Sequence, residues 1–408
     1  MTDKTKSLAG LRVLDFSWFG AGPVATKWLA SCGAEVIRVE SQQRADGMRL
    51  QEPKVGDPAS PNTSLFFNNL NPDKRSILLD LNNPKGMELA RRLVKISDIV
   101  LTNFSPRAIM KWDLTYEALK EIKEDIILMH VPAMGMTGRH REFAGFGSSF
   151  KALGGLNMLM GFEGTSPVGP QGTFTDWCLV PSHVATALLS ALHYRQRTGQ
   201  GQFVEIAQYE CVINATGSSI LEYTVNGRRP PRLGNRHPAM APHGHFPCKG
   251  DDRWVVIAVQ DDDEWASLCY VADKLEWLGD QRFATPAGRL EHVDELERLI
   301  SAWTKDQYEY DLMFRLQQAG VPAGVAQNAQ DLFEHDFQLQ AREHYVWVDH
   351  PETGSQPTDQ AAFRFSRIDN RPVKAAPCMG ESNDYVFQEL LGLSIDEMNE
   401  LIIDNVLY

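Results

Sequence analysis

The feature that most constrains the fold is an alternation of short apolar runs with longer runs of helical period. Pro23 suits the first turn of a helix that Gly33 ends, and amphipathic patterns predict further helices over 84–96 and 181–197. Apolar runs predict strands at 11–16, 35–40, 76–81, 98–101, 126–130 and 202–206. Strands separated by helices favour a mostly parallel sheet. The chain therefore predicts an α/β fold with a Rossmann-like large domain and a smaller α/β domain.

The length of 408 residues is too great for one small domain and suits two domains, or one large domain with an insertion. A Gly-, Pro- and His-rich stretch over 226–250 is interpreted as a long loop that separates them. We expect a large domain over 1–225, a small domain with its preceding loop over 226–335, and a C-terminal part over 336–408 that returns to the large domain.

Composition excludes several classes of partner. A formal net charge of −13 argues against general affinity for nucleic acid or anionic membranes. The six cysteines form no CxxC pair, and the N-terminus has no signal-peptide pattern, so we expect a soluble cytoplasmic protein with reduced thiols. The histidines at 237, 243 and 245 fit no standard zinc spacing, so no metal site is expected.

A glycine turn follows the first predicted strand. Gly20, Gly22 and Ala25 approach the dinucleotide fingerprint, and Glu40 closes the next strand where a ribose-binding acid would stand. Pro23 within the motif weakens the nicotinamide interpretation. A tight β–α turn without a dinucleotide and an NAD-linked dehydrogenase both stay open from the residues alone.

Asp176 and a set of basic residues are further candidates, and each has a structural interpretation beside the functional one. A lone aspartate before a helix, such as Asp176, is usually a cap or a solvated residue, and catalysis is the alternative. A set of basic and polar residues falls near predicted β–α turns, where it would bind phosphate if it were not simply solvated surface. These residues are Arg38, Lys74, Arg75, Asn103, Arg107 and Lys111.

Five segments in order resemble the family III CoA-transferases, which include formyl-, carnitine- and benzylsuccinate-CoA transferases. They are LAGLRVLDFSWFGAGPVATKWLASCGAEVIRVE near the start, NLNPDKRSILLDL at 69–81, DIVLTNFSPRAIMKW at 98–112, TGQGQFVEIAQYE at 198–210 and LGNRHPAMAPHGHFP at 233–247. The resemblance covers nearly the whole chain. It implies an interlocked-ring dimer, either a homodimer or a heteromer with a related subunit, that binds no permanent cofactor and uses a coenzyme A ester as substrate.

The resemblance also assigns the site. The family nucleophile precedes the helix that leads to the TGxGQ turn, which places it at Asp176, and the flap over the site corresponds to 234–244. Coenzyme A contacts are implied on the N-terminal β–α turns, with Phe146 beside the same ligand. The implied contacts are Phe19, Leu79, Asn103, Phe104 and Lys111, with Arg38 and Arg75 nearby.

The chemistry that this implies is covalent. Asp176 would attack a thioester, which the resemblance implies to be succinyl-CoA, to give an aspartyl anhydride and then aspartyl-CoA. A nearby helix N-terminus would favour its ionised form. Phe146 and Gly147 stand where related α-methylacyl-CoA racemases need a histidine, which weakens a racemase interpretation. A non-catalytic CoA-binding subunit would not need Asp176.

The segment around Phe146 and the Trp18-Phe19 pair are most similar to the aromatic-acid branch, in which succinyl-CoA:benzylsuccinate CoA-transferase acts in toluene degradation. Trp18, Phe19, Phe146 and Phe150 would then line an aromatic acceptor pocket. The alternative is that these four side chains belong to the hydrophobic core.

Overall fold

The computed structural model describes residues 6–170 and 174–407. The chain forms two compact units. The first comprises residues 1–156, 170–226 and 341–408, and the second comprises 157–169 and 227–340. Two short helices lie at their boundaries, α7 (Leu156–Leu159) and α16 (Phe337–Ala341).

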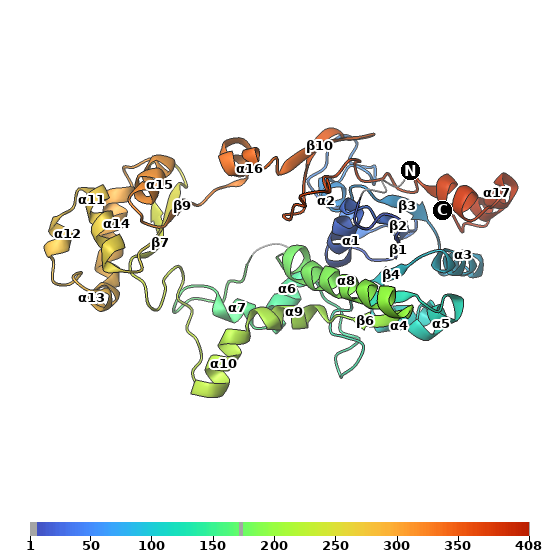
Figure 1. Cartoon of the computed structure of the whole chain (residues 1–408), viewed down its shortest axis with the longest axis horizontal. Helices are drawn as coiled ribbons and strands as arrows, with labels where there is room; N and C mark the ends of the chain where they lie inside the picture. Colours follow the sequence, from blue (N-terminus) through green and yellow to red (C-terminus); the bar gives the residue numbers. More distant parts are fainter. Residues whose placement is uncertain (1–5, 171–173, 408) are drawn as a thin grey trace. The chain divides into compact units, whose positions relative to one another are not determined.

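The first unit is built on a six-stranded sheet in the order β3-β2-β1-β4-β5-β6, in which every neighbouring pair is parallel (Figure 1). This is the doubly wound order, with a switch point between β1 and β4. The strands are β1 (Arg12–Asp15), β2 (Glu35–Glu40), β3 (Arg75–Leu78), β4 (Ile99–Thr102), β5 (Ile127–His130) and β6 (Gln202–Glu205).

Alternating side chains of the strands feed two separate cores, because successive residues of a strand face opposite sides of the sheet. Val13 packs with α1 (Ala21–Ser31) and α8 (Val180–Thr198) on one face. Leu14 packs on the other face against a second layer of helices (Figure 1). These helices are α3 (Pro84–Lys95), α5 (Tyr116–Ile122) and α17 (Ile395–Ile403).

Shorter elements complete the first unit. They are a 3₁₀ turn at Gly47–Leu50, α2 (Leu65–Leu70), α4 (Pro106–Lys111), α6 (Gly147–Leu153), a π-helical turn at Thr175–Leu179, α9 (Gln208–Ala215), α10 (Gly217–Asn226), the antiparallel hairpin of β10 (Tyr345–His350) with β11 (Gly354–Asp359), and a π-helical turn at Tyr385–Leu390.

The second unit has its own core around Trp265, Phe283 and Leu296. Its sheet is antiparallel, in the order β7-β8-β9. Its elements are β7 (His243–Pro247), β8 (Trp254–Ala258), α11 (Asp262–Ala272), α12 (Glu276–Gly279), α13 (Pro286–Glu291), α14 (Val293–Thr304), α15 (Glu309–Gln318), β9 (Ala323–Val325) and a π-helical turn at Asp331–His335.

The α/β class and the parallel sheet of the large domain are confirmed. One local expectation is wrong: the stretch 226–250 is not entirely loop, because β7 forms within it and pairs with β8. Its five residues include Gly244 and Pro247, two types that are depleted in strands, so the strand forms through its pairing with Trp254–Ala258 rather than from local preference.

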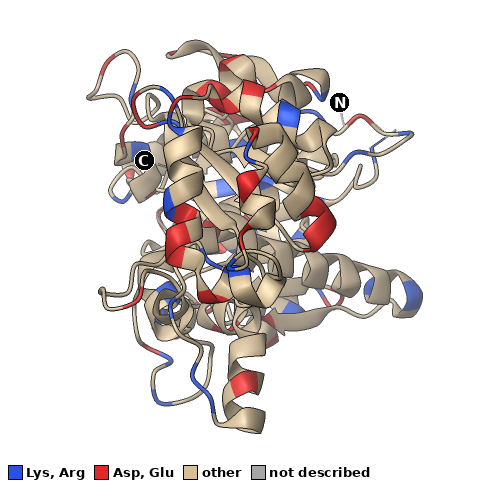
Figure 2. Cartoon of the chain, turned by 90° about the vertical axis from the view of Figure 1, so that its left-hand side faces the viewer, with Lys and Arg blue, Asp and Glu red and all other residues tan. Residues whose placement is uncertain are grey.

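Two features of the structure concern membranes and charged partners: the apolar character of its helices and the distribution of its surface charge. Within residues 6–170 and 174–407, no helix has both the length and the apolar character needed to cross a bilayer. Figure 2 shows lysine and arginine interspersed with aspartate and glutamate on the face in view, rather than gathered over one element.

Candidate functional site

The candidate site lies at the carboxyl ends of β1 and β4, the switch point at which ligands bind in open α/β sheets. Two adjoining turns meet there and are tied together by one side chain. The Asn103 Oδ1 atom accepts from the Trp18 N–H at 3.0 Å, and its Nδ2 donates to the Trp18 carbonyl at 2.7 Å. Asn103 therefore fixes the turn after β1 relative to the turn after β4.

A cavity of about 210 Å³ opens at this point and contains the predicted nucleophile, so we call it the Asp176 cavity. Its walls are largely aromatic and apolar, with two arginines. It is lined by Trp18, Phe19, Gly20, Ala21, Arg44, Asn103, Phe104, Ser105, Pro106, Ala133, Arg141, Phe143, Ala144, Gly145, Phe146, Asp176 and Gln208.

Asp176 stands on the π-helical turn that runs directly into α8. Burial raises the pKa of its carboxyl group to about 6, although a backbone hydrogen bond from Gly147 and the positive charge of Lys151 act in the opposite direction. A helix N-terminus does meet this carboxylate, but it is that of α6, which begins at Gly147. At neutral pH the carboxylate is mostly ionised, as a nucleophile requires.

Two glycines allow the backbone to approach Asp176 closely. A Cβ atom on Gly147 would lie 2.3 Å from the Asp176 Oδ2 atom and 2.5 Å from the Thr175 Oγ1 atom. A Cβ on Gly20 would lie 2.6 Å from the Trp177 ring and 2.9 Å from the Asp176 Cβ. Gly20, the first glycine of the turn that resembles the dinucleotide fingerprint, is thus needed so that this turn can pack against Thr175–Leu179.

Phe19 is held in an unusual backbone conformation at the wall of this cavity. Its φ of 65° is in the left-handed region, which is uncommon for an aromatic residue. Its N–H donates to both oxygens of the buried Asp46 carboxylate, at 3.1 and 3.2 Å. Its ring meets that of Phe146 edge-to-face at 5.1 Å, and a Cβ on Gly47 would lie 2.7 Å from it.

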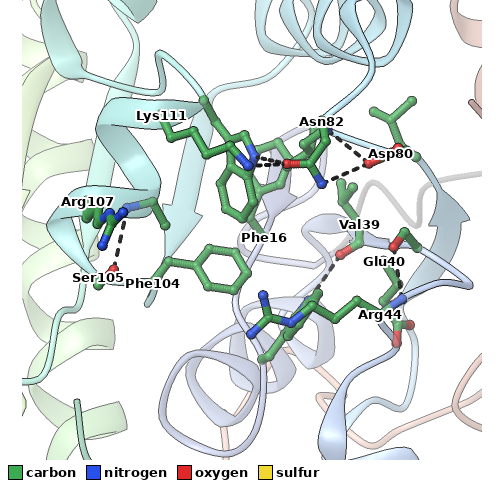
Figure 3. A pocket seen from close by; sticks show the side chains of 16 residues that line it. Phe16, Val39, Glu40, Arg44, Asp80, Asn82, Phe104, Ser105, Arg107 and Lys111 are labelled. Carbon is green, nitrogen blue, oxygen red and sulfur yellow. Dashed lines mark hydrogen bonds between the residues drawn. The ribbon is translucent and has the colours of Figure 1, made fainter.

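A second, larger cavity of about 550 Å³ lies beside the first, and we call it the wide cavity (Figure 3). Arg44, Arg107 and Lys111 give it three cationic side chains. The Lys111 Nζ atom donates to the Asn82 Oδ1 atom at 2.6 Å (Figure 3). It is lined by Phe16, Trp18, Val39, Glu40, Ser41, Arg44, Leu79, Asp80, Leu81, Asn82, Phe104, Ser105, Arg107, Ala108, Lys111 and Trp112.

The two cavities share walls. Trp18, Arg44, Phe104 and Ser105 line both of them. The rings of Trp18 and Phe104 meet edge-to-face at 5.1 Å, and the Arg44 guanidinium lies 5.7 Å from the Trp18 ring centroid. The two cavities therefore adjoin at these four side chains.

Most residues implied by the family resemblance come together here. Phe19, Asn103, Phe146 and Asp176 line the Asp176 cavity, Leu79 and Lys111 line the wide cavity, and Phe104 lines both. Phe150 does not join them, because it is only 1% exposed and belongs to the protein interior.

Arg38 and Arg75 line neither cavity. Arg38 is fully buried, where it forms ion pairs with Asp46 and Glu40 and donates to the Ser17 carbonyl at 3.0 Å. Arg75 pairs with Glu35 at 2.9 Å and stacks on the Tyr385 ring at 3.8 Å. Both guanidinium groups are thus used within the fold.

The lining residues that were not predicted include Arg44, Arg141 and Phe143. Arg141 and Phe143 follow β5, in a stretch without periodicity that the sequence marks only by its glycines. The available signal was their position just after a parallel strand, since such loops gather at the ligand-binding edge. The 234–244 loop, predicted as a flap, belongs to the second unit.

Chemically, the first unit offers a mostly ionised carboxylate in a largely aromatic cavity, beside a second cavity with three cationic side chains. A carboxylate in this setting can act as a nucleophile toward a ligand that also carries anionic groups. In the described part of the chain, no three His, Cys, Asp or Glu side chains are grouped as metal ligands. The residues described around the Asp176 cavity include no histidine, so they offer no imidazole for racemase chemistry.

Comparison with known proteins agrees with this site. Residues 8–383 match the model of CoA-transferase family III. The chain is 35% identical to succinyl-CoA–D-citramalate CoA-transferase of Chloroflexus aurantiacus, over 96% of each chain. It is 29% identical to succinate–glutarate CoA-transferase of Agrobacterium fabrum, over 96% of this chain and 97% of that protein.

A solved CaiB/BaiF family protein from Brucella suis has the same fold, with a TM-score of 0.87 and 30% identity over 94% of this chain and 99% of that one. The chain therefore belongs to CoA-transferase family III. It is a CoA-transferase that acts between an acyl-CoA and a carboxylic acid, and this replaces the NAD-linked dehydrogenase interpretation of the glycine turn.

Proposed function

We propose that this CoA-transferase uses Asp176 as its covalent nucleophile and succinyl-CoA as its donor. The observation that carries the proposal is the Asp176 carboxylate in a cavity that adjoins a second cavity lined by Arg44, Arg107 and Lys111. The wide cavity would hold the phosphorylated part of coenzyme A near Arg107 and Lys111. The thioester would then lie beside Asp176.

In this mechanism an Asp176 oxygen attacks the thioester carbonyl, the C–S bond breaks, and coenzyme A leaves as a thiolate. The thiolate then attacks the Asp176 carbonyl of the anhydride, which releases succinate and leaves aspartyl-CoA. The acceptor carboxylate attacks this thioester and expels the thiolate. The thiolate finally attacks the acyl carbon of the acceptor, which frees the product acyl-CoA and Asp176.

Several features support the choice of Asp176. Its pKa of about 6 makes it a stronger nucleophile than an ordinary carboxylate while keeping it mostly ionised at pH 7. The aromatic walls formed by Phe19, Phe143 and Phe146 favour a poorly hydrated site, in which an anhydride survives long enough to react. The 234–244 loop is proposed as the flap that completes this exclusion of water.

The donor is proposed from relatives. Proteins named as succinyl-CoA–D-citramalate and succinyl-CoA–L-malate CoA-transferases match nearly the whole chain. The latter have alpha and beta subunits, so a related second subunit is a candidate partner beside a homodimer. An aromatic acceptor such as benzylsuccinate is a prediction from the sequence that none of these names includes.

The test is a transfer assay with succinyl-CoA and a panel of acids comprising citramalate, malate, glutarate, oxalate and benzylsuccinate, with products separated by chromatography. We expect a new acyl-CoA from at least one acid. We expect Asp176→Asn to lower its rate at least about 10³-fold, because the amide cannot act as the nucleophile. Full activity of the Asp176→Asn variant would overturn the mechanism.

A further inference from the structure

The charges around the Asp176 cavity are unevenly distributed. The only anionic side chain among the described lining residues is Asp176 itself, whereas Arg44 and Arg141 are both cationic. Arg44 also lines the wide cavity, so it belongs equally to the site proposed for coenzyme A. Arg141 lines the Asp176 cavity and not the wide one.

The guanidinium of Arg141 is only loosely engaged. Its recorded ion pair is with its neighbour Glu142, at 3.6 Å from Nε to Oε1, and both side chains are at least half exposed. An exposed ion pair of this kind is weak, because solvent screens both charges. A ligand carboxylate that approaches from the cavity can therefore replace Glu142 as the partner of Arg141.

The phosphates of coenzyme A have other partners. Arg107 and Lys111 line the wide cavity, on α4 and away from the nucleophile turn. Arg141 instead shares its cavity with Phe143 and Phe146, and with the carboxylate that attacks the thioester. The part of the substrate next to this carboxylate is the acyl group.

We propose that Arg141 binds a second carboxylate at the far end of the acyl group, and so selects dicarboxylic acids over monocarboxylic ones. This inference rests on the proposed function of Asp176. A guanidinium offers a planar fork that matches a carboxylate with two hydrogen bonds. The aromatic walls hold the methylene groups between the two carboxyl carbons.

The same selection applies to donor and acceptor. Each acyl group forms its own anhydride with Asp176, the donor before aspartyl-CoA and the acceptor after it, so both occupy the same cavity in turn. A donor and an acceptor that each carry a second carboxylate are therefore the preferred pair.

The test compares succinyl-CoA with butyryl-CoA, which has the same number of acyl carbons but ends in a methyl group. Hydroxylamine is included, so that the activated Asp176 is trapped as a hydroxamate and no acceptor is needed. The second-order rate constant for modification of Asp176 is measured by mass spectrometry for the wild type, Arg141→Gln, Arg141→Lys and Arg139→Gln. Arg139 is an exposed arginine of the same loop that lines neither cavity, which makes Arg139→Gln the matched control.

We expect Arg141→Gln to lower the rate constant with succinyl-CoA about 10- to 100-fold and to leave that with butyryl-CoA unchanged, as the loss of a charged hydrogen-bond partner predicts. Arg141→Lys should keep part of the preference for succinyl-CoA over butyryl-CoA, and Arg139→Gln should keep all of it. An equal loss with both esters would show that Arg141 contacts coenzyme A, which overturns the inference and leaves the proposed function intact. Failure of the wild type to form a hydroxamate with either ester would overturn the proposed function itself.

Discussion

The cationic side chains near the carboxyl edge of the sheet fall into two groups, one buried in the protein and one exposed at the cavities. Arg38, Arg49 and Lys74 lie behind the edge with fully buried side chains, whereas Arg44, Lys111 and Arg141 lie at the cavities and are exposed. Buried charges require partners inside the protein, and exposed ones stay available to a ligand. A basic residue at a β–α turn is therefore a ligand contact only if the fold leaves its charge unused.

The buried group forms a network around Glu40 and Asp46. Arg49 donates to both Glu40 oxygens at 2.9 Å, and Arg38 pairs with both acids. Burial by itself would raise the pKa of Glu40, but Arg49 and Arg38 outweigh it and lower this pKa to about 2. Burial lowers the pKa of Lys74 to about 7. This network reaches the site through Asp46, which holds the Phe19 backbone.

The largest expected difference between the groups is in stability. Arg49→Met should lower the free energy of unfolding by about 3–5 kcal/mol, because the buried Glu40 loses the closer of its two ion pairs and keeps only Arg38, at 3.3 Å. The exposed Lys111→Met should change it by about 0.5 kcal/mol or less. Urea unfolding of both variants measures the two free energies. Equal, small decreases in the free energy of unfolding would show that the buried and exposed groups do not differ in this respect.

The next largest effect is expected at Gly147, where the site has no room for a side chain. Gly147→Ala places a methyl group 2.3 Å from the Asp176 Oδ2 atom, so the carboxylate must move. A displacement of about 1 Å costs on the order of 10²-fold in rate. Gly217→Ala is the control, because its added Cβ meets nothing within 4 Å. If Gly147→Ala keeps its kcat in the transfer assay, the position of Asp176 is not critical.

The pH dependence should reflect the burial of Asp176. Its pKa is about 6 in the folded protein, above the ordinary value of 3.8, so kcat/KM should fall about tenfold per pH unit below 6. Between pH 3.8 and about 6, the folded state binds more protons than the unfolded state. The wild type therefore loses stability as the pH rises through this window.

The Asp176→Asn variant separates the stability change caused by Asp176 from the effect of pH on the other ionisable groups. Asp176→Asn should unfold at a higher urea concentration than the wild type at pH 8, where the wild-type carboxylate is charged, and should show a smaller difference near pH 4. An unchanged difference across this range would mean that the folded protein does not raise the pKa of Asp176.

The smallest effect is expected for the exposed cations of the wide cavity. Lys111→Met should raise KM for succinyl-CoA and butyryl-CoA alike by roughly three- to tenfold, since one exposed charge contributes about 1 kcal/mol. The exposed Lys120→Met, which lines neither cavity, should leave both values unchanged. A loss confined to one ester would place Lys111 at the acyl group instead.

Sequence patterns predicted much of the fold. The second strand has the predicted bounds, Glu35–Glu40, and the helix predicted over 84–96 is observed as Pro84–Lys95, because the periodicity of both segments is strong and local. The strand β7 was missed, since its pairing with β8 decides it. The π-helical turn at Thr175–Leu179 was missed because it continues directly into α8 without a sequence signal of its own.

The candidate site was predicted unevenly for a similar reason. Family resemblance pointed to Asp176, Phe19, Phe104 and Phe146, which line the two adjoining cavities, but it could not distinguish Arg38 from Arg44. The two differ only in how deeply the fold buries them, which depends on Glu40 and Asp46. Arg141 was missed because its role depends on a loop that only the folded sheet brings to the cavity.

The most direct test of the central claim follows oxygen atoms from the acceptor to the enzyme. The protein is incubated with succinyl-CoA and with succinate whose carboxylate oxygens are heavy isotopes, and the peptide containing Asp176 is examined by mass spectrometry. If Asp176 forms the anhydride, its carboxylate gains heavy oxygen from succinate only when the CoA ester is present. Turnover that leaves Asp176 unlabelled would contradict the account, because the acyl group would then have moved without passing through this residue.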